Sequence, residues 1–222
     1  MYLAGGGTVQ AREPNAGAPV DRSGWGEWLA QHTSADVTVD NRAVAERSAR
    51  RFIDEGRLDE ILAVLLPDDY LLIEFGTADA DRRGSYQLGD ERIPYYLEPA
   101  TDFKVYLDQY IAGAREHGAL PILVTPPAGR TAYCTGSNAT EAQARAVREL
   151  GQARNVPVID LNAQSVAYLA AICPAPQREG FFAPEVDGSR ESAFRDQGAR
   201  TLAGFVANAI AQIEPGLLPS DR

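Results

Sequence analysis

Short apolar runs alternate along this chain with longer stretches whose apolar residues recur at helical spacing. Runs of this kind, bounded by Gly, Pro and Asp, are typical of strands buried on both faces of a parallel sheet. Besides a first strand that opens at Tyr2, they predict strands at 36–40, 70–75, 120–125 and 156–160. The helical spacing predicts helices at 24–30, 43–54, 58–66, 100–117, 140–154, 163–172 and 191–213.

Strands that alternate with helices favour right-handed β-α-β crossovers, and therefore a parallel sheet with helices on both faces. We find no internal repeat and no low-complexity segment that would divide the chain. A length of 222 residues is typical of one α/β domain. The fold class predicted from the pattern is thus α/β, a three-layer α/β/α sandwich formed by residues 1–222 as a single domain.

The first strand leads into three consecutive glycines, Gly5, Gly6 and Gly7. Ligands of open α/β sheets bind beyond the carboxyl ends of the strands, so this turn is where a site is expected. The turn carries no acid or base, and Thr8 has its only hydroxyl. A phosphate-binding loop is not favoured, because neither a following Lys-Ser/Thr pair nor GxGxxG spacing is present.

Charge and composition limit the classes of partner that we expect the protein to bind. The formal net charge is −10, which argues against a nucleic-acid or anionic-membrane surface. No apolar run approaches the ~20 residues that span a bilayer, and we expect a cytoplasmic protein with a small-molecule ligand. The only cysteines, Cys134 and Cys173, are expected to be free thiols. No metal site and no cofactor is predicted, and the pattern leaves the oligomeric state open.

Four stretches together resemble the SGNH (GDSL-type) hydrolase family, and most closely its rhamnogalacturonan acetylesterase branch. The first is Leu3-Ala-Gly-Gly-Gly-Thr-Val9, where the family reads like Ala-Gly-Asp-Ser-Thr-Val. The others are 43–50 followed by 55–57, 69–79 with Phe-Gly-Thr-Ala-Asp, and Asp187-Gly-Ser-Arg190 leading into 197–199. The resemblance covers nearly the whole chain in the right order. It implies a five-stranded parallel sheet with strand order 2-1-3-4-5.

The same resemblance implies that the catalytic positions are replaced. The family's serine nucleophile corresponds to Gly7 and the preceding acid to Gly6. The oxyanion-hole glycine and asparagine correspond to Glu46 and Ala78, and the histidine base to Arg190. Asp187, which orients that histidine in the family, is retained. Acyl transfer needs a nucleophile, a base and oxyanion donors; Gly7 has no nucleophile and an arginine stays protonated. Serine esterase activity is therefore not expected.

Two interpretations of the replacements stay open. Glu46 and Arg190 could form an ion pair that fills the vacated site, since a buried charge needs a partner. Alternatively, Arg190 could bind an anionic group of a substrate while Glu46 transfers a proton. Asp187 could then orient Arg190. Asp79 is interpreted first as a turn residue that accepts backbone hydrogen bonds, and a nucleophilic Thr8 is disfavoured because no base is evident beside it.

The remaining candidates have structural explanations. His32 and His117 lie at predicted helix ends, and Trp25 and Trp28 are expected to be core anchors. The polar segment 77–99, which includes three tyrosines, fits a mobile lid and a plain surface loop equally well.

Two functions follow from these observations. The first is non-hydrolytic acid/base chemistry (isomerisation, elimination or cyclisation) on a small molecule in a biosynthetic pathway. Glu46, Arg190 and Asp187 would be its catalytic residues, with a substrate site at Gly6, Gly7, Thr8, Ala78 and Asp79. The alternative is a catalytically inactive protein that binds a carbohydrate, an ester-like ligand or a protein partner.

Overall fold

A computed structural model describes residues 1–12, 22–173, 178–183 and 194–219 of the chain. Five parallel strands form one sheet in the order β2-β1-β3-β6-β7. Their bounds are β1 Tyr2–Gly5, β2 Asp40–Asn41, β3 Tyr70–Glu74, β6 Leu120–Val124 and β7 Val158–Ile159. When the five strands of this sheet are numbered in the order of the chain, their order across the sheet is 2-1-3-4-5, which confirms the α/β fold class and the predicted strand order.

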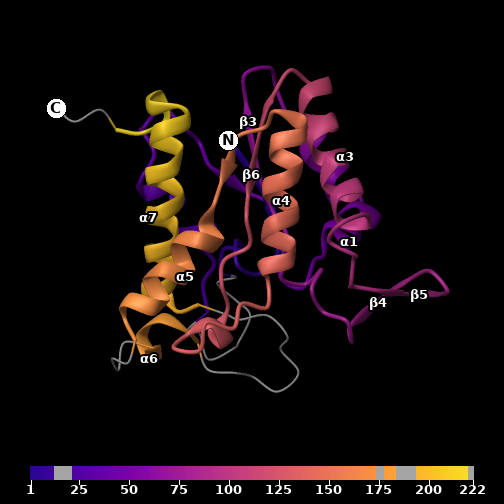
Figure 1. Cartoon of the computed structure of the whole chain (residues 1–222). Helices are drawn as coiled ribbons and strands as arrows, with labels where there is room; N and C mark the ends of the chain where they lie inside the picture. Colours follow the sequence, from indigo (N-terminus) through magenta and orange to yellow (C-terminus); the bar gives the residue numbers. More distant parts are fainter. Residues whose placement is uncertain (13–21, 174–177, 184–193, 220–222) are drawn as a thin grey trace.

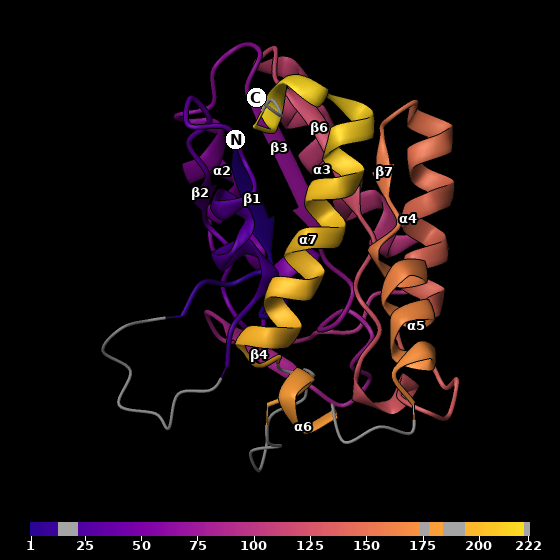
Figure 2. The ribbon, with the colours of Figure 1, turned by 90° about the vertical axis from the view of Figure 1, so that its left-hand side faces the viewer.

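Helices cover both faces of the sheet (Figures 1 and 2). On one side pack α1 Ala49–Asp54, α2 Arg57–Leu62, α3 Asp102–Glu116 and α4 Glu141–Arg154. On the other pack α5 Leu161–Ala171, α7 Asp196–Ile213 and the 3-10 turns η1 Trp25–Glu27 and η2 Leu29–Gln31. The short helix α6 Arg178–Phe181 and the 3-10 turns η3 Arg130–Ala132 and η4 Pro215–Leu217 complete the helical elements of the described ranges.

The alternating direction of side chains along the central strands explains why an apolar core forms on each face of the sheet. In β3, Leu71 and Ile73 face the core beneath α1, α2 and α3, while Leu72 faces the core beneath α7. The same alternation places Leu3 and Ala4 of β1 on opposite faces. Because successive side chains of a strand point to opposite faces, a continuous apolar run supplies two cores at once.

Several predicted boundaries shift. The helix expected at 43–54 begins only at Ala49, where the Ser48 side chain accepts a hydrogen bond from the Arg51 N–H at 3.1 Å. The strand expected at 36–40 is reduced to the edge strand β2. The helix expected at 24–30 is the two turns η1 and η2, and α7 begins at Asp196, with residues 191–193 outside the described part.

The polar segment 77–99 contains an antiparallel hairpin of β4 Ser85–Leu88 and β5 Glu91–Pro94. Tyr86 and Tyr95 stack at its base with ring centroids 5.5 Å apart. The guanidinium of Arg51 lies 5.2 Å from the first ring and 5.6 Å from the second. The hairpin is thus anchored on α1; a role as a lid stays a prediction.

The expectation of two free thiols is wrong. Cys134 and Cys173 form a disulfide, with their Cα atoms 5.4 Å apart. The bond joins the segment between β6 and α4 to the residues that follow α5. The two cysteines lie far apart in sequence, and only the tertiary fold brings them together.

Candidate functional site

The turn after β1 is held by a buried carboxylate. Glu74, at the end of the neighbouring strand β3, is 1% exposed. The Thr8 hydroxyl donates to its two carboxylate oxygens, at 2.8 and 3.1 Å, and the indole N–H of Trp25 donates at 3.1 Å. A buried carboxylate needs such donors. The arrangement fixes the direction of the Thr8 side chain at the carboxyl end of the sheet.

The backbone of this turn leaves no room at its first glycine. A Cβ on Gly5 would come within 2.6 Å of Val9 Cγ2 and 2.8 Å of the Glu74 carbonyl oxygen. The N–H groups of Val9 and Gln10 both donate to the Gly6 carbonyl at 3.1 Å. Glycine is thus required at residue 5 by close packing, and Gly6 and Gly7 follow it in the same tight turn.

The loop after β3 is organised by Asp79, which is fully buried. Its Oδ1 accepts from the Ala49 N–H and its Oδ2 from the Gly76 N–H, each at 2.8 Å. Gly76 has a φ of +134°, and a Cβ there would meet Pro126 Cγ at 2.6 Å. These contacts agree with the interpretation of Asp79 as a turn residue, and they hold the neighbouring Thr77 in place.

Tyr110 supports the same region from α3. Its hydroxyl donates to the Ala49 carbonyl at 2.7 Å. Burial raises the pKa of Tyr110 well above its usual value, and the nearby carboxylate of Asp79 raises it further. Tyr110 therefore stays a neutral donor, and the start of α1 is held from both sides.

The segment between β6 and α4 forms the opposite wall. The Thr140 hydroxyl lies within hydrogen-bonding distance of the Pro127 carbonyl, at 3.2 Å, and of Asn138 Oδ1, at 3.0 Å. Asn162 of α5 donates from Nδ2 to the Pro126 carbonyl at 2.7 Å and to Thr140 Oγ1 at 3.1 Å. Hydrogen bonds and the disulfide together fasten this wall to α5.

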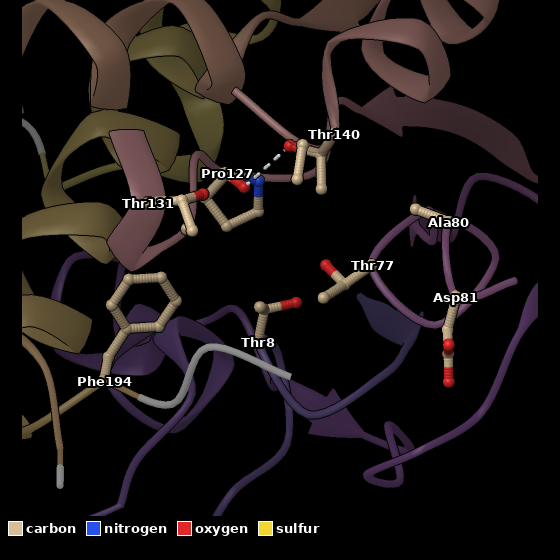
Figure 3. Close-up of a pocket in the computed structure, with 10 residues that line it drawn as sticks. Thr8, Thr77, Ala80, Asp81, Pro127, Thr131, Thr140 and Phe194 are labelled. Carbon is tan, nitrogen blue, oxygen red and sulfur yellow. Dashed lines mark hydrogen bonds between the residues drawn. The ribbon is translucent and has the colours of Figure 1, made fainter. Parts of the chain in front are cut away.

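These loops line an open cavity of about 230 Å³ (Figure 3). Its lining combines hydroxyl groups with small and apolar residues, and it comes from the loops that follow three strands and from the approaches to α4 and α7. The lining residues are Thr8, Thr77, Ala80, Asp81, Pro127, Gly129, Thr131, Ala139, Thr140 and Phe194. Figure 3 shows the Asp81 carboxylate pointing away from the other lining residues. Hydroxyls and apolar surface dominate, as suits a neutral, oxygen-rich ligand.

The size of the cavity limits its ligand. Sites for drug-sized molecules commonly have volumes of ~300–1,000 Å³. A cavity of about 230 Å³ suits one sugar residue or a small acyl group instead. Within the described ranges, no group of three His, Cys, Asp or Glu side chains is placed to hold a metal ion.

The predicted site residues are only partly brought together. Thr8 lines the cavity, and Gly6 and Gly7 lie in the same turn. Ala78 and Asp79 belong to the loop that supplies Thr77, but both are buried and neither is a lining residue.

The charged candidates lie elsewhere. Glu46 is exposed and is not among the described lining residues, and its backbone has a φ of +60°. Asp187 and Arg190 fall outside the described residues, so their relation to Glu46 stays a prediction.

Some lining residues were not expected from the sequence. Thr77 belongs to the Phe-Gly-Thr-Ala-Asp stretch but was not predicted as a site residue, and no role was predicted for Asp81, Thr131, Thr140 and Phe194. The signal that could have found the first four is position, because they follow the carboxyl ends of β3 and β6, where ligands of open sheets bind.

None of the helices in the described part of the chain combines the length and apolar character that crossing a membrane requires.

Comparison with known proteins gives one family. Residues 6–185 match the model of the GDSL-like Lipase/Acylhydrolase family. Two similar curated proteins come from Bacillus subtilis (strain 168). The probable rhamnogalacturonan acetylesterase YesY is 37% identical over 216 residues, covering 96% of this chain and 93% of that protein. The rhamnogalacturonan acetylesterase RhgT is 31% identical over 223 residues, covering 96% and 90%.

Solved structures agree with this fold. Protein YxiM of Bacillus subtilis superposes with a TM-score of 0.77 at 25% identity, over 96% of this chain and 56% of that one. Axe2, an acetylxylan esterase from Geobacillus stearothermophilus, superposes with a TM-score of 0.61 at 14% identity, over 95% and 91% of the two chains. The second likeness bears on the fold alone.

Proposed function

We propose that this chain, which belongs to the GDSL-like lipase/acylhydrolase family, binds an acylated carbohydrate without hydrolysing it. Its relatives YesY and RhgT are named as rhamnogalacturonan acetylesterases, the first as a probable one. Binding without hydrolysis is the second of the two functions expected from the sequence. One observation carries it. The turn beside the cavity presents glycine at residue 7, where the resemblance puts the family's serine, while threonine hydroxyls still line the cavity.

The chemistry of the cavity supports binding over turnover. An esterase of this type needs a hydroxyl nucleophile and a base that takes its proton. Thr8 has the hydroxyl nearest to that position, but it donates to the buried Glu74, which also binds the Trp25 indole. No histidine is among the described lining residues. A ligand of the kind named for YesY and RhgT would be held here by hydroxyl groups.

The acid/base function of Glu46, Arg190 and Asp187 remains a second candidate. A specific observation favours it: Glu46 keeps a left-handed backbone, which costs a non-glycine residue roughly 1–2 kcal/mol. Strain of this kind is common at functional positions. Against it, Glu46 is exposed and does not line the cavity. If Glu46→Gln and Arg190→Met leave the small-molecule products of the producing cell unchanged, this candidate is wrong.

The test of the binding function pairs affinity with turnover. The chain is titrated calorimetrically with acetylated rhamnogalacturonan oligosaccharides and, as matched ligands, the same oligosaccharides after deacetylation. Released acetate is measured over the same period. Binding that prefers the acetylated ligand, without acetate release, is the expected result. Acetate release by the wild-type chain would show an esterase, and absence of binding would refute the binding function.

The sequence predicts a cytoplasmic protein, and we propose an oxidising compartment instead. Cytoplasmic proteins rarely hold stable disulfides, whereas exported proteins often do. The Cys134–Cys173 bond therefore favours an oxidising compartment over the cytoplasm. Thiol titration of protein taken directly from the producing cell, with alkylation at lysis, would decide between the two.

A further inference from the structure

Thr8 presents only hydrogen-bond acceptor capacity to the cavity. A threonine hydroxyl has one hydrogen to donate and two lone pairs that accept. The hydrogen of Thr8 is directed to Glu74, at 2.8 Å from Oε2 and 3.1 Å from Oε1. Thr8 is itself buried and yet lines the cavity. A ligand group that meets Thr8 must therefore bring a hydrogen.

Thr77 can supply the hydrogen-bond donor that Thr8 cannot. Its Oγ1 is buried and has no hydrogen-bond partner within the described structure. Two backbone hydrogen bonds hold the loop around it: the Ala80 N–H donates to the Gly76 carbonyl at 3.0 Å, and the Asp81 N–H donates to the Ala78 carbonyl at 3.0 Å. In Figure 3 the hydroxyl points into the space between Thr8 and the wall formed by Pro127 and Thr140. A buried hydroxyl without a partner is costly, so a ligand atom that pairs with it gains affinity.

The other lining threonines do not share this property. Thr140 Oγ1 accepts from Asn162 and has the Pro127 carbonyl and Asn138 Oδ1 as acceptors for its hydrogen. Thr131 is exposed and can pair with water. Oε1 of Gln143 is also buried without a partner, but Gln143 is not a lining residue.

We propose that Thr8 and Thr77 form a matched pair that recognises a ligand hydroxyl beside a second ligand oxygen. The ligand hydroxyl donates to Thr8 Oγ1, and Thr77 donates to the neighbouring ligand oxygen. Adjacent oxygens on one sugar ring, one free and one acylated, present this combination. The inference rests on the proposed binding function and names the group that the site selects. It involves no covalent step.

The test uses three ligands and three variants. The ligands are a mono-O-acetylated methyl glycoside, its analogue with the neighbouring hydroxyl replaced by fluorine, and its deacetylated parent. The fluorine keeps the size of the hydroxyl and removes the hydrogen that Thr8 requires. Thr77→Val removes the Thr77 donor at constant shape, and Thr77→Ser keeps it. Thr201→Val, on α7 and outside the cavity lining, is the matched control. Calorimetric affinities are measured for each combination, after circular dichroism has shown that each variant is folded.

We expect the wild-type chain to bind the acetylated glycoside about 3- to 10-fold more tightly than its fluorinated analogue, the range of one neutral hydrogen bond. Thr77→Val should lose a similar factor towards the acetylated ligand, and Thr77→Ser should restore it. Thr201→Val should bind like the wild type.

The outcomes separate the two proposals. If the wild type binds but Thr77→Val binds equally well, Thr77 holds only a buried water, and the matched pair is refuted while the binding function stands. If the fluorinated analogue binds as tightly as the acetylated glycoside that carries the hydroxyl, the role of Thr8 is refuted. If the wild type binds none of the three ligands, the binding function fails and the matched pair fails with it.

Discussion

The carboxylate of Asp79 joins the loop after β3 to the first turn of α1, because its Oδ1 accepts the backbone N–H of Ala49 at 2.8 Å. The other oxygen accepts the Gly76 N–H within the same loop. One buried side chain thus fixes two segments that lie far apart in sequence, and one of them supplies Thr77 to the cavity.

Asp79→Ala is expected to lower the free energy of unfolding by about 2–4 kcal/mol, because two buried N–H groups lose their acceptor. Asp79→Asn keeps one acceptor oxygen and should lose less. Urea unfolding followed by circular dichroism measures both changes. Asp36→Ala, at an exposed position outside this loop, is the control and should change stability by less than about 1 kcal/mol. Equal losses for all three variants would contradict the role assigned to Asp79.

The disulfide is expected to stabilise the wall of the cavity. Closing a loop between cysteines separated by 39 positions gives about 3–4 kcal/mol in the chain-entropy model. Reduction should therefore lower the melting temperature of the wild-type chain and weaken ligand binding, because Cys134 lies in the segment that supplies Thr131 and Thr140.

The Cys134→Ser, Cys173→Ser double variant is the control for the reductant itself. It should melt at the lower temperature with or without reductant. Two titratable thiols in the unreduced, denatured wild-type protein would show that the bond does not form.

Glu46→Gly should stabilise the fold. The left-handed backbone at residue 46 costs a side chain with a Cβ about 1 kcal/mol, and glycine adopts it freely. The expected gain corresponds to about 2–4 °C in melting temperature for a chain of this length. Glu46→Ala retains the Cβ and is the matched comparison. If alanine stabilises as much as glycine, the effect comes from the charge of Glu46 and not from its backbone.

Acid should unfold the chain partly through Glu55. Burial alone would raise the pKa of Glu55, but hydrogen bonds from Arg47, Arg57 and Arg51 outweigh it and lower the pKa from its ordinary 4.5 to about 2. A depressed carboxyl pKa stabilises the folded state above pH 4.5, and that contribution is lost as the pH falls from 4.5 to 2.

Because Glu55 is partly exposed and the surrounding solvent screens its charge, we expect the contribution to be about 1–2 kcal/mol. Glu55→Gln should lower stability at pH 7 and flatten its decline between pH 4.5 and pH 2. Chemical unfolding curves recorded at several pH values measure this. A variant whose stability declines as steeply as that of the wild type would contradict it.

The strands of the sheet could be predicted because a parallel strand buried on both faces is a continuous apolar run, as in Tyr70–Glu74. The residues at which helices begin were harder to predict from the sequence. Glutamate is a strong helix former, so nothing in the pattern indicates that Glu46 has a left-handed backbone and that α1 begins only after Ser48.

The sequence indicates where in the fold to look for a site, but it does not indicate which residues line the cavity. The sequence predicts a site at the glycine turn after β1, and the cavity described above lies beside that turn and is lined by Thr8. Thr77 could not be singled out, since threonine is common in turns and its missing partner is a property of the packed loop. The pairing of Cys134 with Cys173 likewise depends on where α5 ends relative to the segment after β6.

The cavity draws its lining from Thr8, close to the start of the chain, and from Phe194, close to its end. During synthesis the chain emerges from its amino end, so β1 and its turn are available long before Phe194. The ligand site is incomplete until the segment leading into α7 has been made. A message truncated before Phe194 would encode all five strands of the sheet but no complete cavity.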